Sequence, residues 1–129
     1  MKIAIATDSF TTVAGHAGKS HHWLVYDCTR DEPIPPPTRV TLERAQLMHY
    51  WQDDGPHPLD GVEIVVAASA GDGFVRHMQA RAATVLLTGA SDPALALEHI
   101  LKGAALPETR FDITTALCKL KDRFSRYSR

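Results

Sequence analysis

The stretch Gly61–Ala68 (GVEIVVAA) constrains the fold of this chain most, because it is almost continuously apolar. A run of this length is too short to span a bilayer and is typical of a central strand that is covered on both faces of a sheet. The runs Lys2–Thr7 (KIAIAT) and Thr84–Leu87 (TVLL) have the same character and predict two further buried strands. Such strands need helices or other packed segments on both faces of the sheet that they form.

Helical patterns follow two of these strands. The Gly-rich turn Gly71-Asp72-Gly73 precedes a predicted helix over Phe74–Arg81. A second helix is predicted from Ser91-Asp92-Pro93 through Lys102, with a capping residue and a proline at its start and Gly103 after its end. Strands that alternate with helices indicate an α/β fold with a partly parallel sheet.

The first half of the chain is less regular. Ser9–Ser20 is rich in Thr, Gly and Ser and predicts a loop or hairpin, and Trp23–Cys28 (WLVYDC) has the composition of a strand. Ile34–Pro37 is too rich in proline for a central strand, so any strand here must lie at a sheet edge. Apolar residues at helical spacing predict a helix of about three turns over Thr41–Trp51, which Asp53–Pro58 (DDGPHP) ends.

The chain of 129 residues has the length of a single domain. We expect residues 1–103 to form the core of this domain and residues 104–129 to extend it. Within the extension, Asp112–Tyr127 predicts an amphipathic helix with one apolar and one mainly basic face. This helix either docks on its own domain or binds a protein partner.

Charge and composition exclude several classes of function. The 14 Lys+Arg and 15 Asp+Glu give a formal net charge of -1, so no global positive field recruits nucleic acid or an anionic membrane. The apolar part of MKIAIATDSF is too short for a signal peptide, and we expect a cytoplasmic protein. Cys28 and Cys118 are too few and too far apart for a disulfide framework or a zinc finger. A chain of this size folds without a metal, so a bound metal would be cargo.

The segment Val13–Ser20 (VAGHAGKS) is the first candidate for chemistry. Its Gly-Lys-Ser ending resembles a phosphate loop, but that motif needs Gly at position 13 and must open a helix rather than precede a strand. What remains is His16 between Gly15 and Gly18, with Lys19 and Ser20 directly after. Glycines let a backbone approach a ligand, an imidazole can bind a transition metal, and a lysine can balance an anionic cluster.

The second candidate is the turn around Gly71-Asp72-Gly73, which runs from a buried strand into a helix. Loops at the carboxyl ends of strands form the ligand crevice of α/β sheets, and N–H groups at a helix start favour anions. Asp8 and Ser9 follow the first strand and are expected at the same end of the sheet. The competing explanation is a tight turn that needs glycine only for its backbone angles.

The remaining histidines and Cys28 are weaker candidates. His21 and His22 stand at the start of a predicted strand, where neighbouring side chains point to opposite faces, so at most one of them is expected to join His16. His77, about one helical turn after Gly73, is placed to approach the crevice. Cys28 offers a soft thiolate for iron or copper, although a lone cysteine is more often a small buried hydrophobe. Three histidines fall in other predicted helices or in a proline-rich loop: His49, His99 and His57.

Three parts of the sequence together resemble the dinitrogenase iron–molybdenum cofactor biosynthesis family. They are the opening MKIAIATDSFTTVAGHAGKSHHWLVYD, the strand and turn EIVVAASAGDG, and the segment TVLLTGASDPALALEHILKG. The resemblance covers about residues 1–103, in order and with compatible spacing. The family loop, Val-x-Gly-His-Phe-Gly-x-Ser, is its most specific motif and is similar to residues 13–20. Ala17 departs from it, because the family commonly has Phe at that place.

The resemblance implies a three-layer ribonuclease-H-like fold with a five-stranded mixed sheet. It also implies non-covalent carriage of an iron–sulfur or molybdenum–iron–sulfur cluster, or of a molybdenum–copper–sulfur cluster, in nitrogenase-type cofactor biosynthesis. The loop histidine of the family corresponds to His16, which is the expected metal ligand. The expected cargo-binding residues are collected from the two candidate segments: Asp8, Ser9, Gly15, His16, Gly18, Lys19, Ser20, Gly71 and Gly73.

Other functions stay open at this stage. The same two loops would serve a small-anion-binding or regulatory module without metal, and the helix Asp112–Tyr127 would serve a scaffold. A nuclease is disfavoured, because Lys2–Thr7 carries no carboxylate for a two-metal centre. We expect no enzymatic turnover, since Ser9, Ser20 and Ser69 lack an activating motif.

Overall fold

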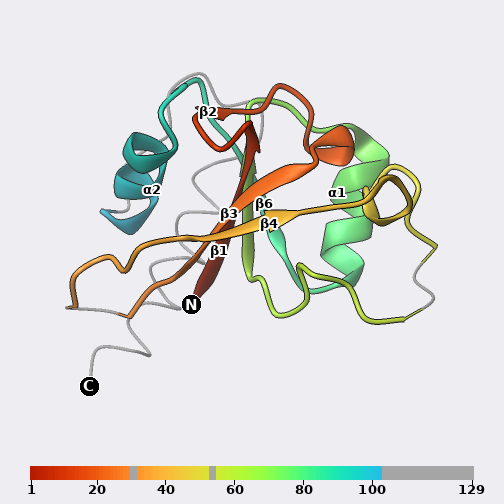
Figure 1. The fold of residues 1–129 in the computed structure, drawn as a ribbon, viewed down its shortest axis with the longest axis horizontal. Coiled ribbons are helices and arrows are strands. Elements are labelled where there is room, and N and C mark those ends of the chain that lie inside the picture. The colour runs from red at the N-terminus through yellow and green to blue at the C-terminus, as the bar shows by residue number, and fades with distance from the viewer. Residues whose placement is uncertain (30–31, 53–54, 103–129) are drawn as a thin grey trace.

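The computed structural model describes residues 1–29, 32–52 and 55–102, and these form one mixed sheet with helices on both faces (Figure 1). Its elements in chain order are β1 (Lys2–Asp8), β2 (Thr12–Val13), the 3-10 turn η1 (Ala17–Lys19), β3 (His22–Asp27), β4 (Thr38–Thr41), the 3-10 turn η2 (Arg44–Gln46), β5 (Ile64–Ala67), α1 (Asp72–Ala80), β6 (Thr84–Leu87) and α2 (Pro93–Leu101). The predicted helix Asp112–Tyr127 lies outside the described residues. No helix within them has the length and apolar character needed to cross a membrane.

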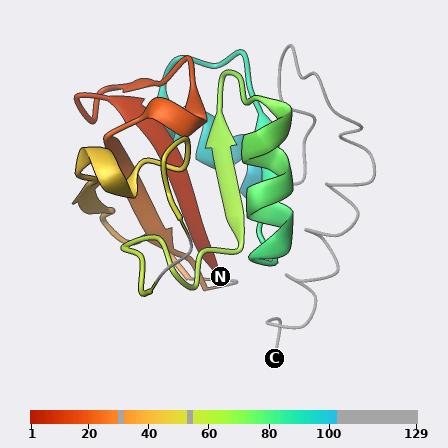
Figure 2. The same ribbon diagram turned by 90° about the vertical axis from the view of Figure 1, so that its right-hand side faces the viewer.

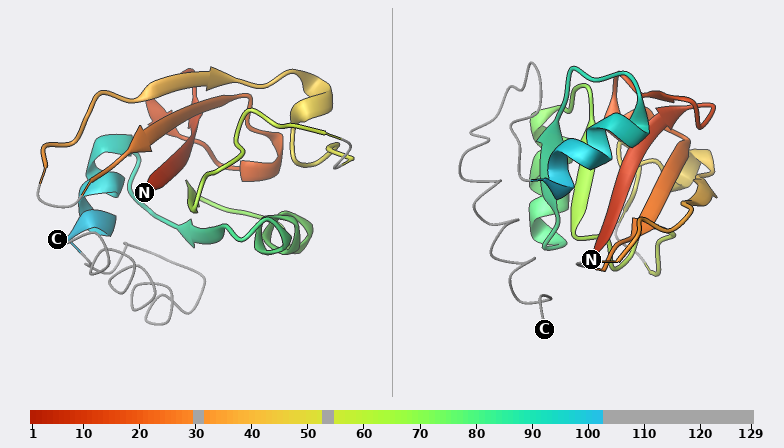
Figure 3. Two further views of the ribbon diagram at one scale, coloured as in Figure 1. Left: turned by 90° about the horizontal axis from the view of Figure 1, so that it is seen from below. Right: turned by 90° about the vertical axis from the view of Figure 1, so that its left-hand side faces the viewer.

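The sheet has the strand order β4-β3-β1-β5-β6, which Figure 3 shows from below, running from orange β4 to teal β6. β1 pairs in parallel with β5, and β5 with β6, while β3 is antiparallel to both β1 and β4. The prediction of a mixed α/β sheet is confirmed. Among the described residues the sheet has six strands rather than the five predicted, because the short β2 also pairs with β1. The ribonuclease-H-like label stays a prediction.

Side chains that alternate along the central strands build two separate cores. On one face, Ala4 and Ala6 of β1 join Val65 of β5 under α1. On the other face, Ile3 and Ile5 join residues of β5 and α2. Figure 2 shows α1 lying along its face, and Figure 1 shows α2 on the opposite side. The central strands are therefore covered on both sides, as their continuous apolar runs predict.

The loop or hairpin predicted for Ser9–Ser20 begins as a tight hairpin between β1 and β2. The Thr11 amide donates to the Asp8 carbonyl at 3.2 Å, and Ser9 and Phe10 have φ of 50° and 68°. Two left-handed residues are the signature of a type I′ turn, which glycine or asparagine normally occupies. Here the Phe10 amide is held at 3.0 Å by the hydroxyl of Thr7. Because positive φ is unfavourable for residues other than glycine, this turn places backbone strain beside the carboxyl end of β1.

The helix predicted over Thr41–Trp51 is wrong. Thr41 continues β4, which lies at the sheet edge as expected for a strand beside the prolines, and the amide of Leu42 donates to the His21 carbonyl at 2.7 Å. Two short turns follow instead. In η2 the Glu43 amide donates to the Gln46 side chain at 2.9 Å, and after it the amides of Tyr50 and Trp51 both donate to the Leu47 carbonyl, at 2.8 and 2.9 Å. The helical spacing arises because Leu42 and later apolar residues of this irregular segment reach the core on the α1 face.

The two predicted helices of the second half are confirmed with small changes in their ends. α1 begins at Asp72 rather than Phe74, and α2 begins at Pro93 after Asp92. The Asp92 carboxylate accepts a hydrogen bond from the Ala94 amide at 2.9 Å, as its predicted capping role requires. Each helix ends one residue before its predicted end, α1 at Ala80 and α2 at Leu101.

Candidate functional site

The parallel strands β1, β5 and β6 end at the same edge of the sheet, and the segment Ala14–Ser20, here the histidine loop, crosses that edge. The Ala14 amide donates to the Ala6 carbonyl of β1 at 2.8 Å. The Ala14 carbonyl accepts from the Ala68 amide after β5 at 3.0 Å, and the Ala17 amide donates to the Ser69 carbonyl at 3.1 Å. Backbone hydrogen bonds to β1 and to the two residues after β5 thus fix the position of the loop before any side chain contributes.

Two buried side chains secure the end of the histidine loop. The Trp23 ring is fully buried in the core on the α1 face, and its Nε1–H donates to the Ser20 carbonyl at 2.9 Å. The Ser20 hydroxyl, also buried, donates to the Thr7 carbonyl at 3.1 Å. Ser20 is a predicted cargo contact, and its hydroxyl joins the loop to β1.

His16 is exposed, and its ring is oriented by Ser69. The Ser69 hydroxyl donates its proton to the Gly15 carbonyl, and the same oxygen lies 3.4 Å from Nδ1 of His16. Because a hydroxyl has one proton to give, a hydrogen bond between these two atoms would need an Nδ1–H that donates to Oγ. That arrangement would leave the Nε2 lone pair to a ligand, as at metal sites where a neighbouring oxygen orients the ring.

A cleft of about 550 Å³ opens beside the histidine loop, between this loop, the segment after η2 and the start of α1. Its lining residues are His16, Ala17, Gly18, Lys19, Met48, His49, Trp51, Gly71, Gly73, Phe74 and His77. The Phe missing from position 17 does not leave the cleft without aromatic side chains, because Trp51 and Phe74 reach it from other segments. Ala17 itself is buried.

The glycines of the two candidate segments are not required by the backbone. Gly71 has φ −76° and ψ 162°, a conformation open to any residue, and Gly15, Gly18 and Gly73 likewise avoid positive φ. A Cβ at Gly15 or Gly71 would meet no atom within 4 Å, and one at Gly18 or Gly73 would make only ordinary contacts. A tight turn that needs glycine for its angles is therefore the wrong explanation of Gly71 and Gly73.

The nine predicted site residues divide between the cleft and a second hollow of about 370 Å³ on the other side of the histidine loop. His16 and Lys19 line both spaces. Those that line the cleft alone are Gly18, Gly71 and Gly73, and those that line the second hollow alone are Asp8, Ser9, Gly15 and Ser20. The two segments are thus brought together as predicted, but they do not share a single cavity.

The structure sorts the weaker candidates. His77 lines the cleft as expected, and His49 lines it too, because the helix predicted around it does not form. His21 and His22 both line the second hollow with His16, since β3 begins only at His22 and the alternation of a strand does not govern the pair. Cys28 is buried, and this burial raises the pKa of its thiol. It therefore behaves as a structural hydrophobe.

Donor geometry limits what the cleft can hold. Among the described residues, no three His, Cys, Asp or Glu side chains come together closely enough to bind one metal ion. The histidines of the cleft instead stand on separate walls, beside the lysine of the loop. Asp8, predicted to follow the first strand, is the last residue of β1.

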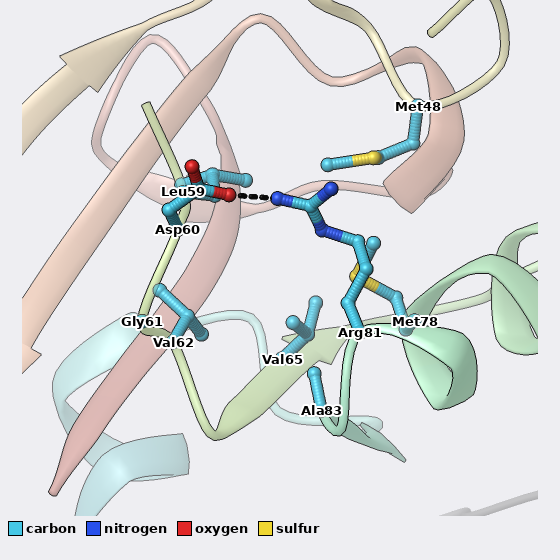
Figure 4. Close-up of a pocket in the computed structure, with 9 residues that line it drawn as sticks. All are labelled: Met48, Leu59, Asp60, Gly61, Val62, Val65, Met78, Arg81 and Ala83. Atoms are coloured by element: carbon cyan, nitrogen blue, oxygen red, sulfur yellow. Dashed lines mark hydrogen bonds and ion pairs between the residues drawn. The ribbon is translucent and has the colours of Figure 1, made fainter. Parts of the chain in front are cut away.

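A third hollow, of about 340 Å³, lies further along the α1 face and is drawn in Figure 4. Met48 lines both this hollow and the cleft, so the two spaces adjoin there. Figure 4 shows the Arg81 guanidinium reaching Asp60, with which it forms an ion pair. The pair joins the end of α1 to the loop before β5, and apolar side chains make most of the remaining wall.

The sequence matches no protein-family model, and it matches no curated protein. Solved structures do resemble the fold. The crystal structure of PH0822 has a TM-score of 0.63 at 18% identity and covers 88% of this chain and 99% of its own. A "putative dinitrogenase (mj0327)" from Methanocaldococcus jannaschii has a TM-score of 0.62 at 10% identity and covers 85% and 92%.

A third similar structure is the NMR structure of a "putative NifB protein" from Thermotoga (TM1290), described as belonging to the DUF35 family. It has a TM-score of 0.57 at 18% identity and covers 85% of this chain and 95% of its own. At such identities these likenesses show a common fold and carry no assignment of activity. This chain is thus an α/β protein with the fold of these three structures.

Proposed function

We propose that this chain is a non-catalytic carrier of a metal–sulfur cluster in nitrogenase-type cofactor biosynthesis, with His16 as a metal ligand. The observation that carries the proposal is the histidine loop itself. Its backbone is fixed to β1 and to the residues after β5, while His16 is left exposed at the mouth of a cleft with a neighbouring lysine. Two structures of similar fold bear nitrogenase-related names, which supports the cellular setting.

The chemistry of the cleft suits an anionic cluster held without covalent attachment. Imidazole nitrogen binds iron, copper and related metals, and Lys19 offers a positive charge to bridging sulfides. Iron–sulfur, molybdenum–iron–sulfur and molybdenum–copper–sulfur clusters all contain such metals together with anionic bridging sulfides. The serines nearest His16 direct their protons to carbonyl oxygens rather than to a base, so a serine nucleophile has no support. Saturable turnover by metal-free protein would contradict the non-catalytic role.

The principal alternative is a small-anion-binding module that uses the same cleft without metal. The observation that favours it is the start of α1, where Gly71 offers no side-chain cap to the first N–H groups of the helix. Asp72 offsets that attraction, because it puts a negative charge in the first turn of α1. Such a module would depend on Lys19 and the Gly71–Gly73 turn more than on His16.

The test is anaerobic loading of metal-free protein with ferrous iron plus sulfide, and separately with tetrathiomolybdate. After desalting, bound metal per chain is compared between wild type, His16→Ala and His99→Ala. His99 lies on α2, on the other face of the sheet, and serves as the matched control. We expect retention in wild type and control, and a loss of at least about tenfold in His16→Ala, equivalent to about 1.4 kcal/mol. Equal retention in all three proteins would remove His16 as a ligand.

If wild type and both variants all fail to retain metal after desalting, cluster carriage itself is contradicted. Titration with inorganic phosphate and sulfate by calorimetry would then test the anion-binding alternative. A Lys19→Ala variant should weaken such binding, whereas His16→Ala should leave it nearly unchanged.

A further inference from the structure

Two histidines far from the histidine loop in sequence line the same cleft as His16. His49 lies in the segment after η2, and His77 lies in α1. Three imidazoles therefore reach one space from three separate parts of the chain. None of the other described histidines lines this cleft, since His21 and His22 lie behind the loop, His57 is buried elsewhere and His99 is on α2.

His49 is placed against the histidine loop by its own backbone. Its amide donates to the Gly18 carbonyl at 2.9 Å, so the second wall moves with the first. Its ring stands edge-on to Tyr50, with the ring centres 4.7 Å apart, and the Arg44 guanidinium covers the same tyrosine at 5.2 Å. The imidazole is exposed yet held by aromatic contact, which lowers the entropy cost of binding.

His77 follows Gly73 by four positions and Phe74 by three. In a helix these spacings place side chains on one face, and all three residues line the cleft. Phe74 is buried and fixes that face of α1 against the core. His77 is half-buried at the same surface, so α1 directs an imidazole at the cleft from a rigid element.

We propose that His49 and His77 are, together with His16, ligands of the cargo, and that the cargo is an anionic polynuclear sulfide cluster. This inference rests on the proposed carrier function and adds the other two contact points. The three imidazoles do not converge as the ligands of one ion would. A cluster several ångströms across can meet each of them, its charge is balanced by Lys19, and its sulfide faces can rest on the apolar walls. Cys28 lies in the other core and supplies no thiolate.

The test compares His49→Gln, His77→Gln, the double variant and His99→Gln, all loaded with ferrous iron plus sulfide as above. Glutamine keeps the length and polarity of the side chain but lacks the ring nitrogen. We expect each single variant to lose the cluster to a chelator about tenfold faster than wild type, and the double variant faster still. His99→Gln should behave as wild type.

A second measurement does not depend on how the variants fold. Wild type labelled with 15N-histidine is loaded and reduced, and pulsed EPR measures nitrogen couplings to the cluster. Couplings from more than one imidazole support the inference, and a coupling from a single one overturns it. The proposed function fails separately, if wild type retains no metal at all. If wild type retains the cluster and only His16 variants release it, the carrier function stands and the assignment of His49 and His77 is wrong.

Discussion

The two walls that face each other across the cleft are held in place in different ways. The histidine loop hydrogen-bonds through its backbone to β1 and to the residues after β5. The opposite wall, Leu47–Trp51, contacts the sheet through packed side chains and has one backbone bond to the loop, from His49 to Gly18. The position of the first wall is therefore set by backbone hydrogen bonds to the sheet edge. The position of the second wall is set mainly by side-chain packing against the core.

One buried histidine supports the second wall. His57 is 5% exposed, and its Nε2–H donates to the Gln46 carbonyl at 2.6 Å. Its Nδ1 accepts a hydrogen bond from the Leu59 amide at 3.0 Å, and its ring stands edge-on to Trp51 with the centres 4.8 Å apart. The neutral imidazole thus links η2, the cleft wall and the loop before β5. The two walls should accordingly respond to different perturbations.

The largest effect is expected from Trp23→Ala, which removes support from the first wall. Loss of a fully buried indole should reduce the free energy of unfolding by about 3–5 kcal/mol. Trp23→Phe keeps most of the packing but loses the hydrogen bond to Ser20, and should cost less, about 1–2 kcal/mol. Urea denaturation measures both. If the two variants are equally destabilised, the bond rather than the packing holds the loop.

The contribution of His57 to the free energy of unfolding should decline in acid, because burial lowers the pKa of its imidazole below the ordinary value. The unfolded chain then binds a proton more readily than the folded one, so this contribution is complete above about pH 6.5 and declines as pH falls toward the lowered pKa. Of the charges that face the ring, Arg81 and His77 also lower its pKa, whereas Asp60 and the bond to Gln46 raise it.

A His57→Phe variant separates this titration from the others in the protein. At pH 8 it should lose about 1–3 kcal/mol, because a backbone donor and a backbone acceptor lose their partner. Its unfolding free energy should also fall less than that of wild type between pH 7 and pH 5. Parallel pH profiles for the two proteins would contradict the role given to His57.

A smaller loss of stability is expected from Ser69→Ala, at about 1 kcal/mol, because the hydroxyl bond to Gly15 disappears. The larger consequence should be functional. Without the Ser69 oxygen the His16 ring loses its orientation, and changes at such supporting positions typically weaken metal affinity about tenfold or more. Chelator competition on the loaded protein measures this, with Ser91→Ala as an exposed control away from the cleft. Unchanged affinity would remove Ser69 from the site.

The smallest stability change, and one of opposite sign, is expected from Gly73→Ala. Alanine in the first turn of α1 should stabilise the fold by about 0.5–1 kcal/mol, since its Cβ meets only the Arg76 side chain at 4.0 Å. If cargo approaches this turn closely, the same methyl should weaken cluster retention. A more stable protein that retains less metal would assign Gly73 to binding, and unchanged retention would place the cargo nearer the histidine loop.

The first wall was largely predictable from sequence, and the second was not. Glycines around a histidine identified the loop, and the strand predicted to end at Thr7 placed Asp8 and Ser9, where the loop or hairpin begins, at the same end of the sheet as the Gly71-Asp72-Gly73 turn. The helical spacing after Thr41 was misleading, because apolar residues at intervals of three to five also suit an irregular segment that touches a core repeatedly. The Glu43 and Gln46 pair, spaced as in a capping box, was the local signal that a short turn begins there.

The sequence by itself determined the central strands, the two helices and the loop that carries His16, since each depends on local pattern and on burial over short distances. Only the tertiary structure decided that His49 and His77 share a cleft with His16, and that the predicted residues divide between two sides of one loop. Such meetings depend on the order of strands and on long-range contacts such as His49 to Gly18. No local periodicity encodes them, because they arise only when the sheet assembles.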